Sequence, residues 1–386
     1  MSVKKPRFEM FPEGYSAGKL GSQVPNTEIG DFDVTRSGVA TRVNKDGLIE
    51  VVAPNVPRLD YSDGGCPKLL TEVASENLLE FSEDFSQGYW NKSNLSIQGG
   101  YASPNGDNSA YLLTANNSSA FFFSTLIVST DNYGSFSVHL KKSSSDGVRL
   151  MIYNVTSQDI IAIKDIDNVE VGGKEYKDGW FRHSVNGGNN WVLGDSVQAI
   201  IYPSSGASAD DASVYIWGAQ LEEQPYATSY IPTNVSPQQR GADSVTNAGD
   251  SSTFNSESGV LFADVKGEDG DLSQRRITIS DGTTNNRVEL ELSQDGEGIR
   301  AIVGGSVVYA ITSIYNQTLQ NKFAISYSSE GIYLWANGLM IGSDFTGELP
   351  TSLNTLALMR WDGLKKFIGK TKSIQHWDYL TDEEME

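Results

Sequence analysis

Alternation of apolar and polar residues with a period of two runs through most of this chain and limits the folds it can adopt. Phe136, Val138 and Leu140 alternate with polar neighbours, and the same pattern returns over 288–292. Successive side chains of a β-strand point to opposite faces, so each such segment offers one face to a core and one to water. Thirty-eight glycines supply turns between these short segments. The sequence therefore predicts an all-β protein made of antiparallel β-sandwiches.

The strand-like segments fall into two blocks, and each predicts a sandwich. The first block covers 76–233, and the second covers 248–386. Residues 234–247, rich in Ser, Gln and Asn, are interpreted as a linker between the sandwiches. Residues 1–75 have a different composition and are expected to form an irregular N-terminal region.

Two local signals fix details of the second block. Asn337-Gly338 lies between apolar runs, which predicts a hairpin with a type I′ turn because both central residues must have positive φ. Near the end of the chain, Thr381 is followed three residues later by Glu384. This spacing is that of a capping box and predicts one short terminal helix.

The charge of the chain excludes several classes of partner. With 29 Lys and Arg against 49 Asp and Glu, the formal charge is −20. Such an excess repels nucleic acid and anionic lipid. The longest apolar runs, such as 121–123, are far shorter than the roughly 20 residues that span a bilayer. We therefore expect a soluble protein that binds no nucleic acid, inserts into no membrane and, lacking the apolar stretch of a signal peptide, is not secreted by that route.

Cysteine and histidine are too scarce for most metal or nucleophilic centres. Cys66 is the single cysteine, which excludes an internal disulfide, and the three histidines are far apart in sequence. No nucleophile elbow of the Gly-x-Ser-x-Gly type accompanies a plausible base. The glycine pairs at 187–188 and 304–305 lie between strands and are interpreted as turns, not phosphate-binding loops.

Several ordered motifs in the first 233 residues resemble a module of tailed-bacteriophage structural proteins. They lie at 40–50, 55–61, 66–70, 77–79, 81–85, 89–90, 179–182, 217–222 and 228–233. The resemblance implies a carbohydrate-binding-module-like jelly roll. The second block, through 335–338, 367–370 and 380–384, is similar to a concanavalin A-like, laminin-G-like sandwich.

These resemblances imply a structural virion protein of a tailed bacteriophage, a fibre or appendage displaying glycan- or receptor-binding sandwiches. Such proteins are made in the host cytoplasm, are usually homo-oligomers, most often trimers, and contact other virion proteins and a host surface glycan or receptor. Residues 1–75 carry a charge of only −1, from nine basic and ten acidic residues, so we expect them to form the virion-attachment region. The alternatives are a polysaccharide-cleaving virion enzyme and a bacterial surface adhesin.

Both sandwich folds also occur in glycoside hydrolases, which directs attention to Glu289 and Glu291. Two residues apart on one strand, they face the same side, as a retaining pair would. Val288, Leu290 and Leu292 occupy the other face as a core stripe. We interpret the two glutamates as a solvated outer face and predict no catalytic residue and no enzymatic activity.

Two kinds of binding residue follow from the resemblance to jelly rolls and lectin-like sandwiches. A structural calcium ion would need loop carboxylates, and the candidates are Asp84, Asp210 and Asp211; otherwise these side chains face water. No other cofactor is expected. A pyranose would need an exposed aromatic platform, and the candidates are Tyr333, Trp335 and Trp361. The sequence leaves open which face of the 332–336 strand is buried.

Overall fold

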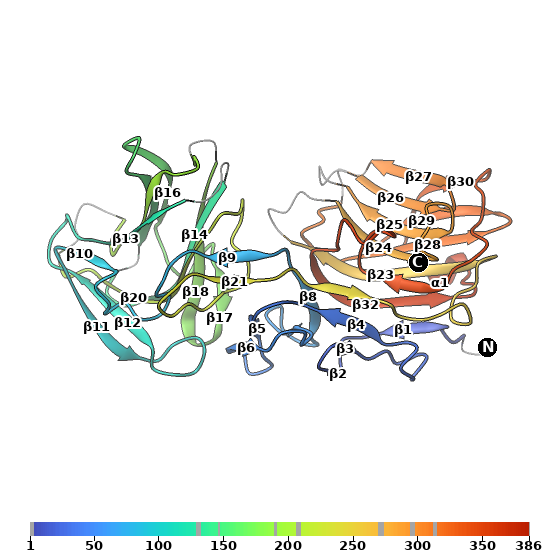
Figure 1. Cartoon of the computed structure of the whole chain (residues 1–386), viewed down its shortest axis with the longest axis horizontal. Coiled ribbons are helices and arrows are strands. Elements are labelled where there is room, and N and C mark those ends of the chain that lie inside the picture. The colour runs from blue at the N-terminus through green and yellow to red at the C-terminus, as the bar shows by residue number, and fades with distance from the viewer. Residues whose placement is uncertain are drawn as a thin grey trace. The chain divides into compact units, whose positions relative to one another are not determined.

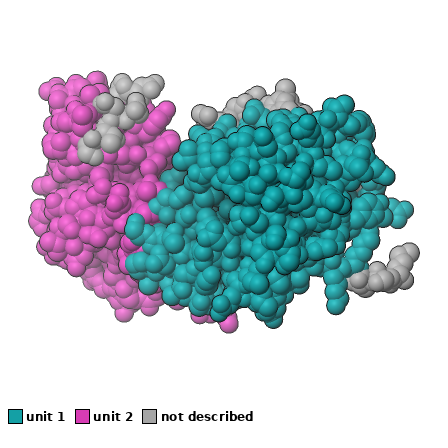
Figure 2. Space-filling view, turned by 45° about the vertical axis from the view of Figure 1, so that its right-hand side comes forward, with its two compact units in different colours: residues 1–37, 53–73, 242–386 teal, residues 38–52, 74–241 magenta. Residues whose placement is uncertain are grey.

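The computed structural model describes residues 4–128, 133–145, 147–188, 191–205, 210–268, 274–293, 298–311 and 315–385. The chain divides into two compact units, coloured in Figure 2: unit 1 contains 1–37, 53–73 and 242–386, and unit 2 contains 38–52 and 74–241. Each unit is built from antiparallel sheets, many of whose strands are labelled in Figure 1. The prediction of an all-β protein with antiparallel sandwiches is confirmed. Within the described residues no helix is long and apolar enough to cross a membrane.

One sheet of unit 1 has eight strands, contributed by both ends of the chain: β1 (Phe8–Met10), β7 (Leu59–Asp60), β8 (Lys68–Thr71), β23 (Gly259–Gly267), β28 (Asn321–Ser328), β29 (Gly331–Ala336), β30 (Leu339–Asp344) and β32 (Gly369–Trp377). Seven of them follow the order β30-β29-β28-β23-β32-β8-β7, and β1 also pairs with β32. The first strand of the chain is therefore hydrogen-bonded to the last one.

The second large sheet of unit 1 has five strands in the order β27-β26-β25-β24-β31: β24 (Arg275–Ser280), β25 (Arg287–Leu292), β26 (Gly298–Val303), β27 (Ser306–Ile311) and β31 (Thr355–Ala357). A smaller sheet has four strands in the order β2-β3-β4-β22: β2 (Tyr15–Ser16), β3 (Lys19–Leu20), β4 (Phe32–Thr35) and β22 (Ser244–Thr246). The helix α1 (Asp382–Met385) follows β32.

The core of unit 1 lies between its two large sheets. Ile325 and Leu334 come from the eight-stranded sheet, and Ile277, Leu290 and Ile299 come from the five-stranded sheet; all five belong to one buried cluster. Their alternate neighbours along each strand point away from this cluster. The period-two pattern of the sequence therefore separates the core face from the outer face of each sheet.

Unit 2 is a second sandwich with two large sheets. Its six-stranded sheet follows the order β11-β12-β20-β14-β18-β17: β11 (Leu95–Tyr101), β12 (Ala110–Ala115), β14 (Tyr133–Lys142), β17 (Lys174–Tyr176), β18 (Trp180–Gly188) and β20 (Ser213–Glu222). Its five-stranded sheet follows the order β10-β13-β19-β15-β16: β10 (Asn91–Ser93), β13 (Phe121–Ile127), β15 (Val148–Asn154), β16 (Asp159–Ile166) and β19 (Ser196–Tyr202).

Smaller elements complete unit 2. They are the pair β5 (Ala40–Val43) and β6 (Ile49–Val52), the pair β9 (Ser75–Asn77) and β21 (Gln238–Arg240), and the short 3₁₀ turn η1 (Lys177–Gly179). The main core contains Phe122, Val138 and Ile201, from three different strands. A second cluster includes Trp180 and Trp217, which are both buried packing residues.

The division into units differs from the expected boundaries at 75, 233 and 247. Residues 1–75 are shared between the units, and β1, β7 and β8 extend a sheet of unit 1. The expected linker 234–247 contains β21 and β22, and the boundary between units falls inside it, after residue 241. These strands pair with partners more than 100 residues away, and the sequence pattern of a short strand does not reveal a distant partner.

The two local predictions in the second block are confirmed. Asn337 and Gly338 connect β29 to β30 with φ angles of 48° and 83°, as a type I′ turn requires. The backbone N–H of Thr381 donates to the carboxylate of Glu384 at 2.7 Å, and α1 begins at the next residue. Both features depend only on neighbouring residues.

Several motifs that carry the phage resemblance form the buried polar framework of unit 2. The guanidinium of Arg182 donates to the carbonyl oxygen of Thr228 at 2.6 Å, and Glu222 accepts hydrogen bonds from the backbone and hydroxyl of Thr228. Asn77 donates to the carbonyl oxygens of Ala219 and Ile231. Because these side chains are buried, they hold strands together within unit 2 and do not face solvent.

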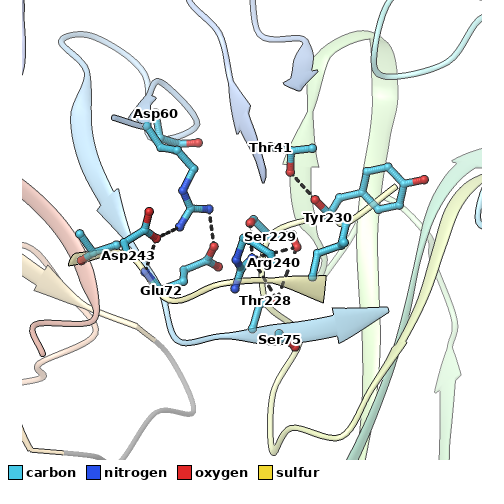
Figure 3. A network of polar contacts seen from close by, with 12 residues as sticks. Thr41, Asp60, Glu72, Ser75, Thr228, Ser229, Tyr230, Arg240 and Asp243 are labelled. Atoms are coloured by element: carbon cyan, nitrogen blue, oxygen red, sulfur yellow. Dashed lines mark hydrogen bonds and ion pairs between the residues drawn. The ribbon is translucent and has the colours of Figure 1, made fainter. Parts of the chain in front are cut away.

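A buried ion network does the same in unit 1. Arg58 pairs with Glu72 at 2.5 Å and also with Asp243, and Arg36 pairs with Asp243 at 3.2 Å. Figure 3 shows Glu72 and Asp243, whose carboxylates both pair with Arg58. Burial would lower the pKa of Arg58, but the two carboxylates raise it above its ordinary value. The motif at 55–61 therefore supplies an anchor between distant segments of unit 1.

Candidate functional site

A row of three half-buried aromatic rings lies on the outer face of the five-stranded sheet of unit 2. Phe121 and Phe123 extend from β13, with ring centroids 5.4 Å apart. Tyr202, at the end of β19, lies 5.7 Å from Phe121. Phe122 points to the opposite face, into the core, where it stacks on Trp90 at 5.0 Å. We call Phe121, Phe123 and Tyr202 the aromatic row.

An ion pair borders the aromatic row at the Tyr202 end. Arg149 of β15 lies opposite Tyr202 in register, and its guanidinium carbon is 5.9 Å from the Tyr202 ring centroid. Its Nε and Nη2 donate to the two carboxylate oxygens of Asp165 at 2.5 and 2.9 Å. This bidentate bond raises the pKa of Arg149 and lowers that of Asp165. Both groups are therefore charged at neutral pH and held in a fixed geometry.

Polar side chains also border the other side of the row. Asn91 and Ser93 of β10 lie opposite Phe123 and Phe121 in the strand register, so they share the same sheet face. The result is an apolar strip with hydrogen-bonding groups on both sides. A pyranose has an apolar face of C–H groups and a rim of hydroxyls, and this arrangement can contact both.

Unit 2 also contains a polar cleft, which we call the Glu83 cleft. It has a volume of about 780 Å³. Most of its lining side chains carry hydrogen-bonding groups: Glu83, Asp84, Asn108, Ser109, Tyr111, Thr233, Asn234 and Gln238, with Gly100 and Pro232 completing it. Such a lining suits hydroxyl-rich ligands more than apolar ones.

Two adjacent carboxyl groups of this cleft have pKa values shifted in opposite directions. Burial raises the pKa of Glu83, and a hydrogen bond from the Tyr230 hydroxyl at 2.8 Å offsets part of the shift. Burial would also raise the pKa of Asp84, but hydrogen bonds, including those from Gln87 and Tyr111, lower it to about 2. Asp84 is therefore a fixed anion whose oxygens are already occupied by the protein's own donors.

The structure separates the aromatic residues that the sequence suggested for a glycan. Trp335 is only 7% exposed and packs in a cluster with Leu380 and Met385 of the C-terminal segment. Tyr333, on the same strand, packs edge-to-face against Phe345. Trp361 lies in the segment after β31, and β31 belongs to the five-stranded sheet of unit 1. The outer face of β29 thus carries Tyr333 and Trp335, but the C-terminal segment covers the tryptophan.

Of the three carboxylates suggested for calcium, Asp84 is distant in sequence from the adjacent pair Asp210 and Asp211, and its environment differs from theirs. Asp84 accepts hydrogen bonds from Ser86, Gln87 and Tyr111, whereas Asp210 and Asp211 are exposed in a turn before β20. Across the part of the chain that is described, no three His, Cys, Asp or Glu side chains form a group that could hold a metal ion. Calcium binding at these positions stays an untested prediction.

Glu289 and Glu291 correct the expectation of a solvated strand face. They point away from the core, as the alternation predicted, yet neither has exposed surface. Arg276 contacts both carboxylates, at 2.5 Å for Glu291, and Arg300 contacts Glu291 at 3.1 Å. Long arginine side chains from the neighbouring strands cover the glutamates, so these carboxylates do not present a catalytic pair to a substrate.

The aromatic row was missed because the sequence reasoning used 121–123 only to exclude a membrane span. Successive side chains of a strand point to opposite faces of the sheet, so three consecutive phenylalanines cannot all point into the core. If Phe122 enters the core, Phe121 and Phe123 must lie on the outer face. This signal was present in the sequence, but Tyr202 joins the row only through the pairing of β13 with β19.

No protein-family model matches the sequence, and no curated protein is detectably similar to it. Among solved structures, the chain is similar to the CBM40 module of a Ruminococcus gnavus sialidase bound to α2,3-sialyllactose, with 17% identity over 33% of this chain and 80% of that one, and a TM-score of 0.29. It is similar to domains LG4-5 of the mouse laminin α1 chain, with 10% identity over 65% and 84%, and a TM-score of 0.28. It is also similar to the CBM22 tandem of Paenibacillus barcinonensis Xyn10C, with 9% identity over 80% and 99%, and a TM-score of 0.28. These scores carry no ligand or activity over to this chain.

Proposed function

We propose that this is a non-catalytic carbohydrate-binding protein whose aromatic row stacks against pyranose rings. The observation that carries the proposal is the combination on one sheet face of Phe121, Phe123 and Tyr202 with the bidentate pair of Arg149 and Asp165. The rings offer a surface for C–H groups. The side chains of Asn91 and Ser93 and the Arg149–Asp165 pair offer donors and acceptors for hydroxyls, and the ion pair is already oriented before a ligand arrives.

The test is a glycan array followed by calorimetry with the best neutral oligosaccharide, using Phe123→Ala and Tyr202→Ala. We expect each variant to bind at least about fivefold more weakly, because loss of an aromatic contact removes about 1 kcal/mol. Thr125→Ala is the matched control, since Thr125 is exposed on the same face of the same strand. Unchanged affinity in both aromatic variants, with circular dichroism of folded protein, would reject the row as the binding site.

The Glu83 cleft is a second place in unit 2 where the same function could reside. Its polar lining would bind hydroxyls by hydrogen bonds with little stacking. Asn108→Ala, on an exposed residue of the lining, distinguishes the two sites. A loss of binding in this variant, with normal binding in Phe123→Ala, would move the saccharide to the cleft.

We further propose that the protein is a structural part of a tailed-phage virion, as a fibre or appendage that displays its saccharide site in several copies. The sequence motifs between 40 and 233 support this role, and oligomerisation would strengthen weak saccharide contacts by avidity. Attachment through residues 1–75 belongs to this proposal. Because β1, β7 and β8 extend a sheet of unit 1, deleting residues 1–75 would damage that sheet as well as any attachment surface.

Point variants test attachment more sharply than a deletion. Tyr15 and Ile29 are large apolar residues that are 44% and 51% exposed on unit 1. Purified particles should contain the wild-type protein by mass spectrometry and lose most of a Tyr15→Ser, Ile29→Ser double variant. Absence of the wild-type protein from particles would reject the virion role, and full incorporation of the variant would reject this attachment surface. Light scattering of the purified protein would test the expected trimer.

A polysaccharide-cleaving enzyme and a bacterial surface adhesin remain the alternative functions. The burial of Glu289 and Glu291 beneath arginines removes the residue pair on which cleavage was considered. Release of reducing ends from bacterial surface polysaccharide by the wild-type protein would nevertheless establish an enzyme. Detection of the protein on bacterial cells in the absence of phage particles would establish an adhesin.

A further inference from the structure

Four arginines lie on and beside the outer face of the five-stranded sheet of unit 1. Arg276 of β24 and Arg300 of β26 stand in one row across the sheet, on either side of Glu291 of β25. Arg287 begins β25, and the charge of Arg360, after β31, acts on it. We call Arg276, Arg287, Arg300 and Arg360 the arginine face. The carboxylates of Glu289, Glu291 and Asp362 lie among these arginines, so the four cations outnumber their carboxylate partners by one in a chain with a formal charge of −20.

Both glutamates of this region form ion pairs with Arg276. Its guanidinium pairs with Glu289 and, at 2.5 Å, with Glu291. The second oxygen of Glu289 accepts a hydrogen bond from the Thr278 hydroxyl at 2.9 Å. Arg360 has its own partner in Asp362, at 2.5 Å. The existing ion pairs therefore neutralise Arg276 and Arg360 more completely than they neutralise Arg287 of β25.

Arg287 is the cation with the weakest compensation on the arginine face. Its side chain is 10% exposed, and its ion pair with Glu289 spans 3.9 Å. Nη1 donates to the carbonyl oxygen of Thr284, but the buried Nε has no hydrogen-bond partner. Burial lowers the pKa of Arg287, and the neighbouring charges of Arg276 and Arg360 lower it further, whereas the attraction of Glu289 and Glu291 opposes the shift.

Arg58, in the same unit, shows what full compensation looks like. It is completely buried, yet Glu72 and Asp243 both contact its guanidinium. The pKa of Arg58 is consequently raised, whereas that of Arg287 is lowered. A buried guanidinium without such partners is stabilised by an anion from outside the chain, and its planar donors match the two oxygens of a carboxylate or sulfate.

We propose that the arginine face binds the carboxylate or sulfate group of an acidic saccharide, with Arg287 as the central contact. Arg300 and Arg360 have side chains 37% and 25% exposed, so the region is open to a ligand at these positions. The saccharide part of this proposal rests on the proposed function, and the anion part does not. The site is in unit 1 and is separate from the aromatic row of unit 2.

The experiment is calorimetry on the full chain with three probes: tetragalacturonate for a carboxylate, a sulfated dextran oligosaccharide for a sulfate ester, and inorganic sulfate for the bare anion. We expect at least one acidic saccharide to bind, more weakly at 300 mM than at 50 mM NaCl because salt screens the charges. Arg287→Gln and Arg360→Gln should each weaken this binding about tenfold. Lys19→Gln is the matched control, since Lys19 is a half-exposed cation of the same unit paired with Asp33.

The outcomes separate this site from the aromatic row. Equal affinity of Arg287→Gln and Lys19→Gln for the acidic saccharides would overturn the proposal. Binding of inorganic sulfate without binding of either acidic saccharide would also overturn it. Phe123→Ala should leave acidic-saccharide binding unchanged, so failure of either site does not decide the other. Thermal unfolding controls for misfolding: Arg287→Gln should be at least as stable as the wild type, because it removes an undercompensated buried charge.

Discussion

Acid should destabilise unit 1 through one buried histidine. His376 of β32 has no exposed surface; its Nε2 lies 3.0 Å from the Tyr327 hydroxyl, and its ring packs edge-on against Phe254 at 5.4 Å. Burial lowers the pKa of His376 from 6.5 to about 4, with Asp378 opposing and Arg7 adding to the shift. In the unfolded chain, the imidazole would take up its proton near 6.5.

The sign of the pH effect follows from these two values. Between pH 6.5 and 4 the unfolded chain binds more protons than the folded chain, so the free energy of unfolding falls as the pH falls. The contribution of His376 is fully present above pH 6.5 and lost as the pH drops toward 4. The separation of the two pKa values corresponds to about 3 kcal/mol, of which about 2 kcal/mol develops between about pH 7 and pH 4.5.

The assay compares the wild type with His376→Gln, which keeps a hydrogen-bonding group near Tyr327 but removes the titration. The free energy of unfolding would be measured by urea denaturation at several pH values, with hydrogen exchange of β32 peptides reporting on unit 1. Carboxylates titrate in both proteins, so the difference between the two profiles isolates the histidine. We expect the wild type to lose about 2 kcal/mol more than the variant on acidification to about pH 4.5. Parallel profiles would refute the reasoning.

Three further predictions concern stability and packing. Arg58→Met should lower the free energy of unfolding of unit 1 by about 3–5 kcal/mol, because it removes the guanidinium that pairs with the buried carboxylates of Glu72 and Asp243, whereas Lys19→Met should cost about 1 kcal/mol or less; urea midpoints compare them. Gly338→Ala should cost about 1–2 kcal/mol, since its φ of 83° strains any residue with a Cβ, and a midpoint equal to that of the wild type would contradict the turn assignment. Removal of residues 379–386 should shift tryptophan emission to the red and increase acrylamide quenching, because Leu380 and Met385 cover Trp335; an unchanged spectrum would argue against this cover.

Features that depend on neighbouring residues were predicted well. The period-two alternation gave the strands and their core faces, and the Asn337-Gly338 turn and the Thr381 capping box form as expected. Each of these is decided by backbone sterics or by hydrogen bonds within a few residues. The same local reasoning could not assign residues 1–75, because the partners of β1 and β8 are in β32, about 300 residues or more away.

The candidate sites show where local reasoning stops. Trp335 was a reasonable platform on its strand, yet a segment that returns from the end of the chain covers it. Glu289 was expected to face water, yet arginines of the same outer face bury it. The aromatic row needs Tyr202 beside Phe121, and only the pairing of two strands about 75 residues apart provides this. Burial depends on what lies above a face, which a strand's own pattern does not contain.

The sequence by itself determined an all-β chain, its core faces and its tightest turns, because period two and positive φ are properties of the local backbone. Only the tertiary structure decided which outer faces are open and which charges are paired. Side chains such as Arg58 and Arg287 have the same chemistry in the sequence, and the carboxylates brought to them by distant segments make one a structural anchor and the other a candidate anion site. Long-range strand pairing sets those neighbours, and with them the burial and charge balance on which binding depends.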